Sequence, residues 1–142
     1  MRALRVVDNP SAADVAALDD RINRFNLTTS GIDDARYLSI MVHGADGTLD
    51  AGLHGHSWGG YCEIKLLWVA ERRRGQGIGS AMIAAAEREA IARGCDRIIL
   101  STHSFQAPTF YERHGFRAIA AIPDCPRGHA HVMMAKHIGR AA

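Results

Sequence analysis

The chain has little of the material that several classes of protein require. Its 142 residues include only three cysteines, and 6% are aromatic. Three is an odd number without the spacing of a disulfide framework, so we expect reduced thiols that are buried as small apolar groups. No apolar run approaches the roughly 18 residues of a membrane helix, and no signal peptide precedes the first apolar segment. These absences predict a cytoplasmic protein without a membrane partner.

The charge balance gives little reason to expect a nucleic-acid partner. The net charge is only +2, and the basic residues cluster at Arg72, Arg73 and Arg74, directly before a glycine-rich stretch. Such a run is often a solvated surface, whereas here it flanks a candidate anion site and could assist it. With 47% apolar residues, the chain can bury one core, and we expect a single domain over residues 1–142.

The glycine-rich stretch is the most informative part of the chain. Residues 74–79 read Arg-Gly-Gln-Gly-Ile-Gly between a strand-like and a helix-like run. Because glycine leaves little side chain over a helix start, backbone N–H groups can approach a bulky anion there. A P-loop would end in Gly-Lys-Ser/Thr, and Gly79-Ser80 lacks the lysine. A dinucleotide fingerprint would place an acid at the end of the next strand, whereas Asp96 precedes that strand. The pattern therefore predicts a phosphate compound of another kind.

A second motif follows further along the chain. Arg74, Gly77 and Gly79 fit Arg-x-x-Gly-x-Gly, and residues 110–116 read Phe-Tyr-Glu-Arg-His-Gly-Phe. One helix-like run and one strand-like run separate the two motifs. In pattern and order the pair resembles the pyrophosphate loop and the groove-closing Phe-Tyr-x-x-x-Gly-Phe segment of the GNAT superfamily, which are acetyl-CoA-dependent N-acetyltransferases. The resemblance covers residues 61–116 well.

The hydrophobic pattern predicts where the helices lie. Ser11 with Asp14 is typical of a helix start, and apolar residues then recur at helical spacing, so this helix should bury one face. We expect a loop over 26–35. A second helix follows the glycines and ends at Gly94. A short helix should begin at Pro108 and end near His114. The apolar residues of the first helix are Val15, Leu18, Ile22 and Phe25.

Strands are expected at 4–7, 37–43, 49–56, 61–69, 96–102, 115–122 and 131–137. Asp46-Gly47 suits a hairpin turn, and Gly59-Gly60 suits the next turn. This order predicts an α+β fold. The resemblance implies a GNAT-like mixed, mostly antiparallel sheet of six to seven strands, splayed between strands 4 and 5, with helices on both faces.

The resemblance also implies which residues hold acetyl-CoA, the expected co-substrate. Backbone amides of Leu67 and Val69 would bind the pantetheine and polarise the thioester. Gln106 stands near the place where many members carry an asparagine that contacts the cofactor, and it could supply a similar amide. The pyrophosphate would be held by Arg74, Gly75, Gln76, Gly77, Ile78, Gly79 and Ser80.

Acetyl transfer to an amine requires a proton acceptor for the ammonium and a proton donor for the departing thiolate. Tyr111 fits the donor, because a phenol with a pKa of about 10 stays protonated at neutral pH and the family usually carries its acid at this place. Phe110-Tyr111 could instead be a packing pair. Glu63 matches a glutamate that some members use as base through water. Alternation would place Glu63 on one face with Lys65, Leu67 and Val69, so an exposed Glu63–Lys65 charge pair is the alternative.

The eight histidines offer other candidates. His54 with His56, and His129 with His131 near Cys125, have residue types found in zinc sites. Four ligands at a defined spacing are absent, so we expect no metal. His103 or His129 could instead relay a proton at the acceptor end.

Together these observations predict an acyltransferase that moves acetyl directly from acetyl-CoA to a primary amine, most simply that of a small molecule. Direct transfer is favoured because no cysteine lies within either motif. The alternatives are a non-catalytic CoA-binding regulatory domain, a protein or peptide amine acetyltransferase, and a nucleic-acid binder that uses the arginine cluster. Homodimers are common among relatives, so a homodimer is possible.

Overall fold

The computed structural model describes residues 3–139, which divide between Asp33 and Asp34 into two compact units. The first unit carries helix α1 (Ala12–Ser30). The backbone N–H of Asp14 donates to Ser11 Oγ at 3.0 Å, so Ser11 caps this helix as predicted. The predicted loop at 26–35 is wrong in its first half, because nothing in the sequence interrupts the helix before Gly31. That glycine ends α1 in the left-handed conformation, with φ 74°.

The strand predicted at residues 4–7 is absent from the sheet, which starts at Arg36. A four-residue strand depends on a neighbouring strand for its hydrogen bonds, and these residues have no such pairing. Helix α1 buries no residue within its own unit, because a single helix has no second layer to pack against. Burial of its apolar face therefore stays a prediction.

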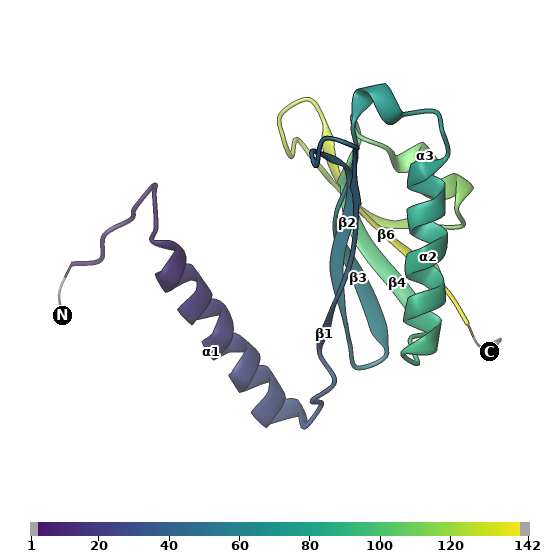
Figure 1. Cartoon of the computed structure of the whole chain (residues 1–142). Coiled ribbons are helices and arrows are strands. Elements are labelled where there is room, and N and C mark those ends of the chain that lie inside the picture. The colour runs from purple at the N-terminus through teal and green to yellow at the C-terminus, as the bar shows by residue number, and fades with distance from the viewer. Residues whose placement is uncertain (1–2, 140–142) are drawn as a thin grey trace. The chain divides into compact units, whose positions relative to one another are not determined.

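The second unit contains a six-stranded sheet in the order β1-β2-β3-β4-β6-β5 (Figure 1). All neighbours pair antiparallel except β3 and β4, which run parallel. The hairpin turn at Asp46-Gly47 and the turn at Gly59-Gly60 form as predicted, and these three glycines have positive φ. The strands are β1 (Arg36–His43), β2 (Leu49–Trp58), β3 (Tyr61–Val69), β4 (Arg97–His103), β5 (Arg117–Pro123) and β6 (Ala130–His137).

Helix α2 (Ile78–Ala92) lies along one face of this sheet (Figure 1). Its inward side chains meet the apolar residues of β1 to β4 in one core, which includes Leu53, Ile64, Met82 and Ile98. A short 3-10 helix η1 (Glu71–Arg73) precedes the glycines, and α3 (Pro108–Arg113) follows β4. The α+β fold with a mixed, mostly antiparallel sheet is therefore confirmed, whereas a helix on the second face stays a prediction.

Strand β3 contains a bulge that the sequence did not predict. The pairing with β2 shifts so that Gly55 pairs with Ile64 while His54 pairs with Leu66, which leaves Lys65 as the extra residue. A bulge reverses the alternation of side chains beyond it. Leu67 and Val69 accordingly pack against the core next to α2, on the side of Ile64. The prediction that Glu63 shares their face is wrong.

Two further features bear on the predictions. The parallel pairs between β3 and β4 run from Tyr61 with Arg97 to Ile64 with Leu100, and β3 continues beyond the last pair. Cys62 and Cys95 are buried as expected, whereas Cys125 is exposed, because it lies in the turn between β5 and β6. No helix within residues 3–139 has both the length and the apolar character to cross a membrane.

Candidate functional site

The glycine loop is shaped by two different requirements. Gly75 and Gly77 have φ of 76° and 80°, a left-handed conformation that side chains disfavour. A Cβ at either position would meet no atom within 4 Å, so the surface beside the loop is open. Gly79 differs, since its Cβ would lie 3.3 Å from the Phe110 ring on α3. The first two glycines thus set the backbone, and the third lets α3 approach α2.

The start of α2 is suited to an anion. Gly77 is its N-cap residue and supplies no capping side chain. Within the described chain, no side chain accepts a hydrogen bond from the N–H groups of Ile78, Gly79 or Ser80. Uncapped amides at the positive end of a helix dipole are favourable partners for a phosphate group. The open loop and these amides therefore fit a pyrophosphate.

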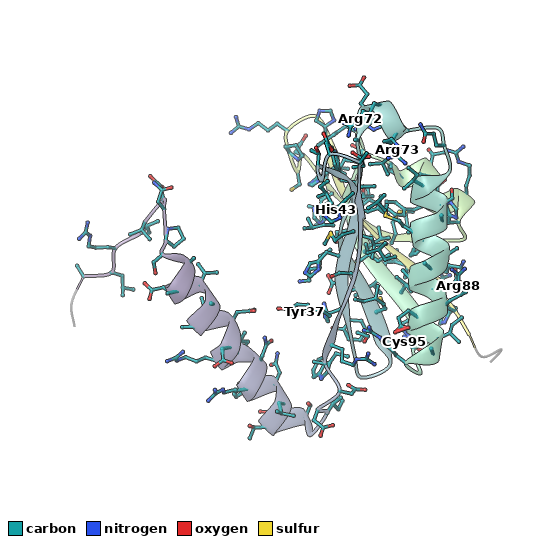
Figure 2. All side chains as sticks on the ribbon, in the orientation of Figure 1. Tyr37, His43, Arg72, Arg73, Arg88 and Cys95 are labelled. Carbon is teal, nitrogen blue, oxygen red and sulfur yellow. The ribbon has the colours of Figure 1, made fainter. Side chains whose placement is uncertain are left out.

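A buried carboxylate anchors the approach to the loop. Asp50, at the start of β2, is 2% exposed and forms ion pairs with both Arg72 and Arg73. Both arginines belong to η1, and Figure 2 shows them at the end of the sheet opposite Cys95. The N–H of Ala70 also donates to the Asp50 carbonyl oxygen at 2.7 Å. Two of the three clustered arginines are therefore held by the protein itself and are only partly available to an external anion.

The other side chains of the loop brace its backbone. Arg74 Nε donates to the Val69 carbonyl oxygen at 3.0 Å, which ties the loop to the end of β3. Gln76 accepts from Arg73 Nε at 3.2 Å and donates to the Arg72 carbonyl oxygen at 3.4 Å. These bonds tie the turn from β3 into α2 to the chain's own side chains.

Tyr111 lies on α3 beside this loop. It is 8% exposed, and its ring packs edge-on against Phe110 and Phe116 at centroid distances of 5.3 and 5.8 Å. Burial raises the pKa of the Tyr111 phenol above its usual value of 10.0, because a phenolate would be poorly solvated there. The hydroxyl makes no hydrogen bond to any described residue. The group is therefore a protonated and uncommitted donor at neutral pH.

A hydrogen bond joins the glycine loop to the helix of Tyr111. Ser80 Oγ, in the first turn of α2, lies 3.0 Å from Nε2 of His114, the C-cap residue of α3. The His114 ring also contacts Phe110 at 4.7 Å. The candidate phosphate site and the candidate acid are thus held in one arrangement, which the spacing of the two motifs did not reveal.

Glu63 lies on the face of the sheet away from α2, opposite His56 on β2. Burial lowers the pKa of His56, and the nearby Glu63 carboxylate offsets part of this shift. Among the described residues Glu63 forms no ion pair, so the alternative of a Glu63–Lys65 pair is not realised.

Gln106 does not present its carbonyl oxygen to a ligand. That oxygen accepts from the backbone N–H of His103 at 2.8 Å and from Thr102 Oγ1 at 3.2 Å, and it lies 3.0 Å from His103 Nδ1. Only its amide nitrogen is left for the predicted cofactor contact. The histidine pairs do not assemble a metal site, since residues 3–139 contain no group of three His, Cys, Asp or Glu side chains placed to hold a metal ion.

A hollow of about 390 Å³ lies at the opposite end of the parallel strands. It is lined at the amino ends of β3 and β4, near Gly59 and Asp96, whereas the glycine loop follows the carboxyl end of β3. Figure 2 shows Cys95 at that far end and Arg72 near the loop. This hollow is therefore separate from the candidate site.

Comparison with protein families matches residues 34–118 to the acetyltransferase (GNAT) domain. The match contains both motifs, the bulged strand and the buried tyrosine. The chain belongs to the GNAT family.

Relatives support the assignment of this GNAT chain. It is 42% identical over 116 residues to the blasticidin-S acetyltransferase of Streptomyces morookaense, covering 79% of this chain and 85% of that protein. An acetyltransferase of Agrobacterium fabrum is 38% identical over 106 residues, covering 75% and 77%. A solved structure from Agrobacterium tumefaciens, assigned to the acetyltransferases, has a TM-score of 0.85 at 32% identity and covers 96% of this chain and all of its own.

The family identifies the protein as an acyltransferase, and GNAT acetyltransferases use acetyl-CoA. An aminoglycoside 6'-N-acetyltransferase solved with coenzyme A has the same fold, with a TM-score of 0.62 at 20% identity over 75% of this chain and 76% of its own. The expected family, enzyme class and co-substrate are thereby confirmed. The prediction missed Asp50, whose position at the start of a predicted strand was its only signal, and the Ser80–His114 contact, which had none.

Proposed function

We propose that the protein transfers an acetyl group from acetyl-CoA to a primary amine of a small molecule, by direct attack of the amine on the thioester. The observation that carries this proposal is the uncapped start of α2 behind an open glycine loop, linked by Ser80 and His114 to the helix that bears a buried tyrosine. Phosphate binding and proton donation would thereby share one site.

The proposed binding role belongs to the loop. The N–H groups of residues 75–80 would donate to the pyrophosphate oxygens, and Gln76 with Arg74 keeps the loop in place for them. The backbone amides of Leu67 and Val69 would hold the pantetheine and polarise the thioester carbonyl. We propose that β3 diverges from β4 beyond the pair of Ile64 with Leu100, which leaves those amides available.

The proposed acid is Tyr111, which would protonate the thiolate as the C–S bond breaks. A phenol of raised pKa remains protonated at the pH where the reaction runs, so the proton is present when the thiolate forms. Glu63 is proposed as a carboxylate on the acceptor side, where it would attract an ammonium group. It lies on the sheet face away from α2, whereas the glycine loop leads into α2.

The proposed acceptor is a small amine. The support is the blasticidin-S acetyltransferase at 42% identity, whose printed name specifies a small molecule. A protein or peptide amine is the competing acceptor, and a catalytically silent CoA-binding domain is the competing function.

Release of free CoA tests both points. The purified protein would be incubated with acetyl-CoA and a panel of amines, blasticidin S and lysine-containing peptides among them, while the free thiol is titrated. We expect CoA release with at least one small amine and none with the peptides. Binding of CoA in a calorimeter without any turnover would favour the regulatory domain.

The variant Tyr111→Phe examines the acid. It keeps the ring contacts and removes only the hydroxyl, so acetyl-CoA affinity should be unchanged while kcat falls by about 100-fold. Tyr37→Phe is the matched control, because Tyr37 is exposed on the edge strand β1 and should keep wild-type activity. Unchanged kcat in Tyr111→Phe would remove Tyr111 from the mechanism.

A further inference from the structure

The hydrogen bonds around Gln106 select one tautomer of the neutral ring of a histidine. The Gln106 oxygen lies 2.8 Å from the backbone N–H of His103, which can only donate. This contact settles the orientation of the amide, since the amide nitrogen in that place would oppose one donor with another. Thr102 Oγ1 donates to the same oxygen at 3.2 Å. Gln106 Oε1 is therefore an acceptor.

The same oxygen lies 3.0 Å from His103 Nδ1. A neutral imidazole carries hydrogen on one nitrogen and a lone pair on the other, and two lone pairs facing each other would repel. Nδ1 must therefore carry the hydrogen and donate it to Gln106. The lone pair of neutral His103 is consequently on Nε2, which has no hydrogen-bond partner among the described residues. His103 is held as a proton acceptor through this one atom.

The position of His103 matches that role. It is the last residue of β4, at the end of the parallel strand pair from which the glycine loop also departs. The last pair between the two strands joins Ile64 to Leu100, and His103 lies three residues past Leu100, roughly 10 Å further along. On β3, the residues about three positions past Ile64 lie level with His103. They include Leu67, whose amide we propose to hold the thioester.

The turn after His103 also connects it to the proposed acid. The backbone N–H of Gln106 donates to the His103 carbonyl oxygen at 2.9 Å, which closes the turn. Ala107 follows directly, and its carbonyl oxygen accepts from the Tyr111 N–H at 3.3 Å in the first turn of α3. His103 and Tyr111 are thus mounted on the two ends of one short, hydrogen-bonded segment.

Neighbouring rings restrain the imidazole. The Phe105 ring stacks on it at 5.3 Å with an interplanar angle of 11°, and the His131 ring of β6 meets it edge-on at 5.1 Å. His129 in turn contacts Phe105 at 4.9 Å. The titratable groups around His103 are therefore these two histidines, and no described carboxylate forms an ion pair with it.

We propose that His103, oriented by Gln106, accepts the proton that the acceptor ammonium must lose before attack. This inference rests on the proposed function and adds a catalytic residue, His103, and a positioning residue, Gln106. It assigns to His103 the role of base that the sequence had assigned to Glu63, and leaves Glu63 to attract the cation.

The ammonium gives one proton to Nε2 of neutral His103, which becomes an imidazolium. The freed lone pair forms the C–N bond at the thioester carbonyl carbon, and the C–S bond breaks with its electron pair going to sulfur. Tyr111 protonates the thiolate, and the second proton of the nitrogen restores Tyr111 through solvent. The imidazolium then returns its proton to water, so one proton is released for each acetyl group transferred.

Two variants test this role. His103→Asn keeps an amide N–H where Nδ1 stood but has no lone pair in place of Nε2, so kcat should fall by about 100-fold with the KM for acetyl-CoA unchanged. Gln106→Glu keeps the acceptor and adds a negative charge that favours the imidazolium. Its kcat/KM profile for the amine should therefore rise at higher pH than that of the wild type, by about one unit. His137→Asn, at the far end of β6, is the matched control and should behave as wild type.

Each result has a distinct meaning. Suppose that the wild-type protein releases CoA with an amine. If His103→Asn is then unimpaired, or if the pH profile of Gln106→Glu does not move, the role of His103 is overturned and the proposed function stands. A wild-type protein that releases no CoA with any amine overturns the proposed function as well. The tautomer can be measured without turnover, because imidazole ¹⁵N shifts distinguish the two nitrogens. We expect Nδ1–H in neutral His103, and Nε2–H would overturn the inference.

Discussion

Gly55 on β2 lies so close to Glu63 on β3 that a Cβ atom on the glycine would stand 1.9 Å from the Glu63 carbonyl oxygen. The contact occurs next to the bulge at Lys65, where two residues of β3 face one of β2. The absence of a side chain at this position therefore permits the bulge. The bulge in turn places Leu67 and Val69 on the side of α2 and leaves Glu63 on the other.

Gly55→Ala should destabilise the protein strongly. The added methyl group would collide with backbone atoms, which cannot move away as a flexible side chain could, so we expect a loss of roughly 3 kcal/mol in the free energy of unfolding. Urea denaturation of both proteins measures the loss. Gly52→Ala on the same strand is the control, because its nearest neighbour is the sulfur of the Met41 side chain at 3.2 Å, which can shift. Equal stabilities of the two variants would contradict the proposed role of Gly55.

Gly77→Ala should weaken CoA binding. The residue has φ 80° and open space at its Cβ, so the substitution strains the loop by about 1 kcal/mol and places a methyl group over the amides that should bind the pyrophosphate. Gly47→Ala in the β1–β2 hairpin is the matched control, with φ 83° and the same open surroundings. Calorimetry with CoA should show at least a tenfold weaker affinity for the first variant only. A parallel decrease in both would attribute the effect to general strain.

Asp50→Asn should loosen the segment that leads into the glycine loop. The carboxylate is buried and pairs with Arg72 and Arg73, so its neutralisation leaves two arginines without their counter-charge and should lower stability by about 2 kcal/mol. We also expect a higher KM for acetyl-CoA and little change in kcat. The exposed pair of Asp96 with Arg97 provides the control, and Asp96→Asn should change neither quantity. A wild-type KM in Asp50→Asn would show that the loop keeps its shape without this anchor.

Stability should fall as the solution becomes alkaline. Burial raises the pKa of the Cys62 thiol from 9.0 to about 11, so the unfolded chain loses this proton first as the pH increases. The protonated Cys62 thiol contributes fully to stability below pH 9, and this contribution is lost as the pH passes through 11. The free energy of unfolding should fall by about 2 to 3 kcal/mol. Thermal unfolding at pH 8 and pH 11 would measure the decline. Cys62→Ala should show a smaller decline, and an equal decline in both proteins would exclude Cys62 as its source.

Local patterns predicted most of the elements correctly. Ser11 caps α1, Gly94 follows α2 with φ 83°, and Pro108 begins α3, because each of these signals acts within one turn of backbone. The strand predicted at residues 4–7 failed for a related reason. A short apolar run can become a strand only when a neighbour supplies its hydrogen bonds, and the sequence does not say whether one does.

The candidate site was predicted unevenly. The glycine loop and Tyr111 could be proposed from the sequence because both lie in contiguous motifs. The face assigned to Glu63 was wrong, since alternation holds only where no bulge intervenes. Gln106 was assigned to the cofactor, whereas its carbonyl oxygen is taken up by Thr102 and His103. A side chain that can reach several partners is committed only when the surrounding turn has formed.

The amino-acid sequence by itself determined the family, the enzyme class and the loop suited to a phosphate, because those depend on residues that are neighbours along the chain. The tertiary structure decided which side chains and backbone groups contact one another in the folded protein. The register of β2 against β3 set the bulge, the folded sheet brought Asp50 to Arg72 and Arg73, and the turn after β4 placed the Gln106 oxygen against the His103 ring. Such contacts join residues far apart in the chain or depend on one hydrogen-bonded geometry, and only folding selects that geometry from the many that the sequence permits.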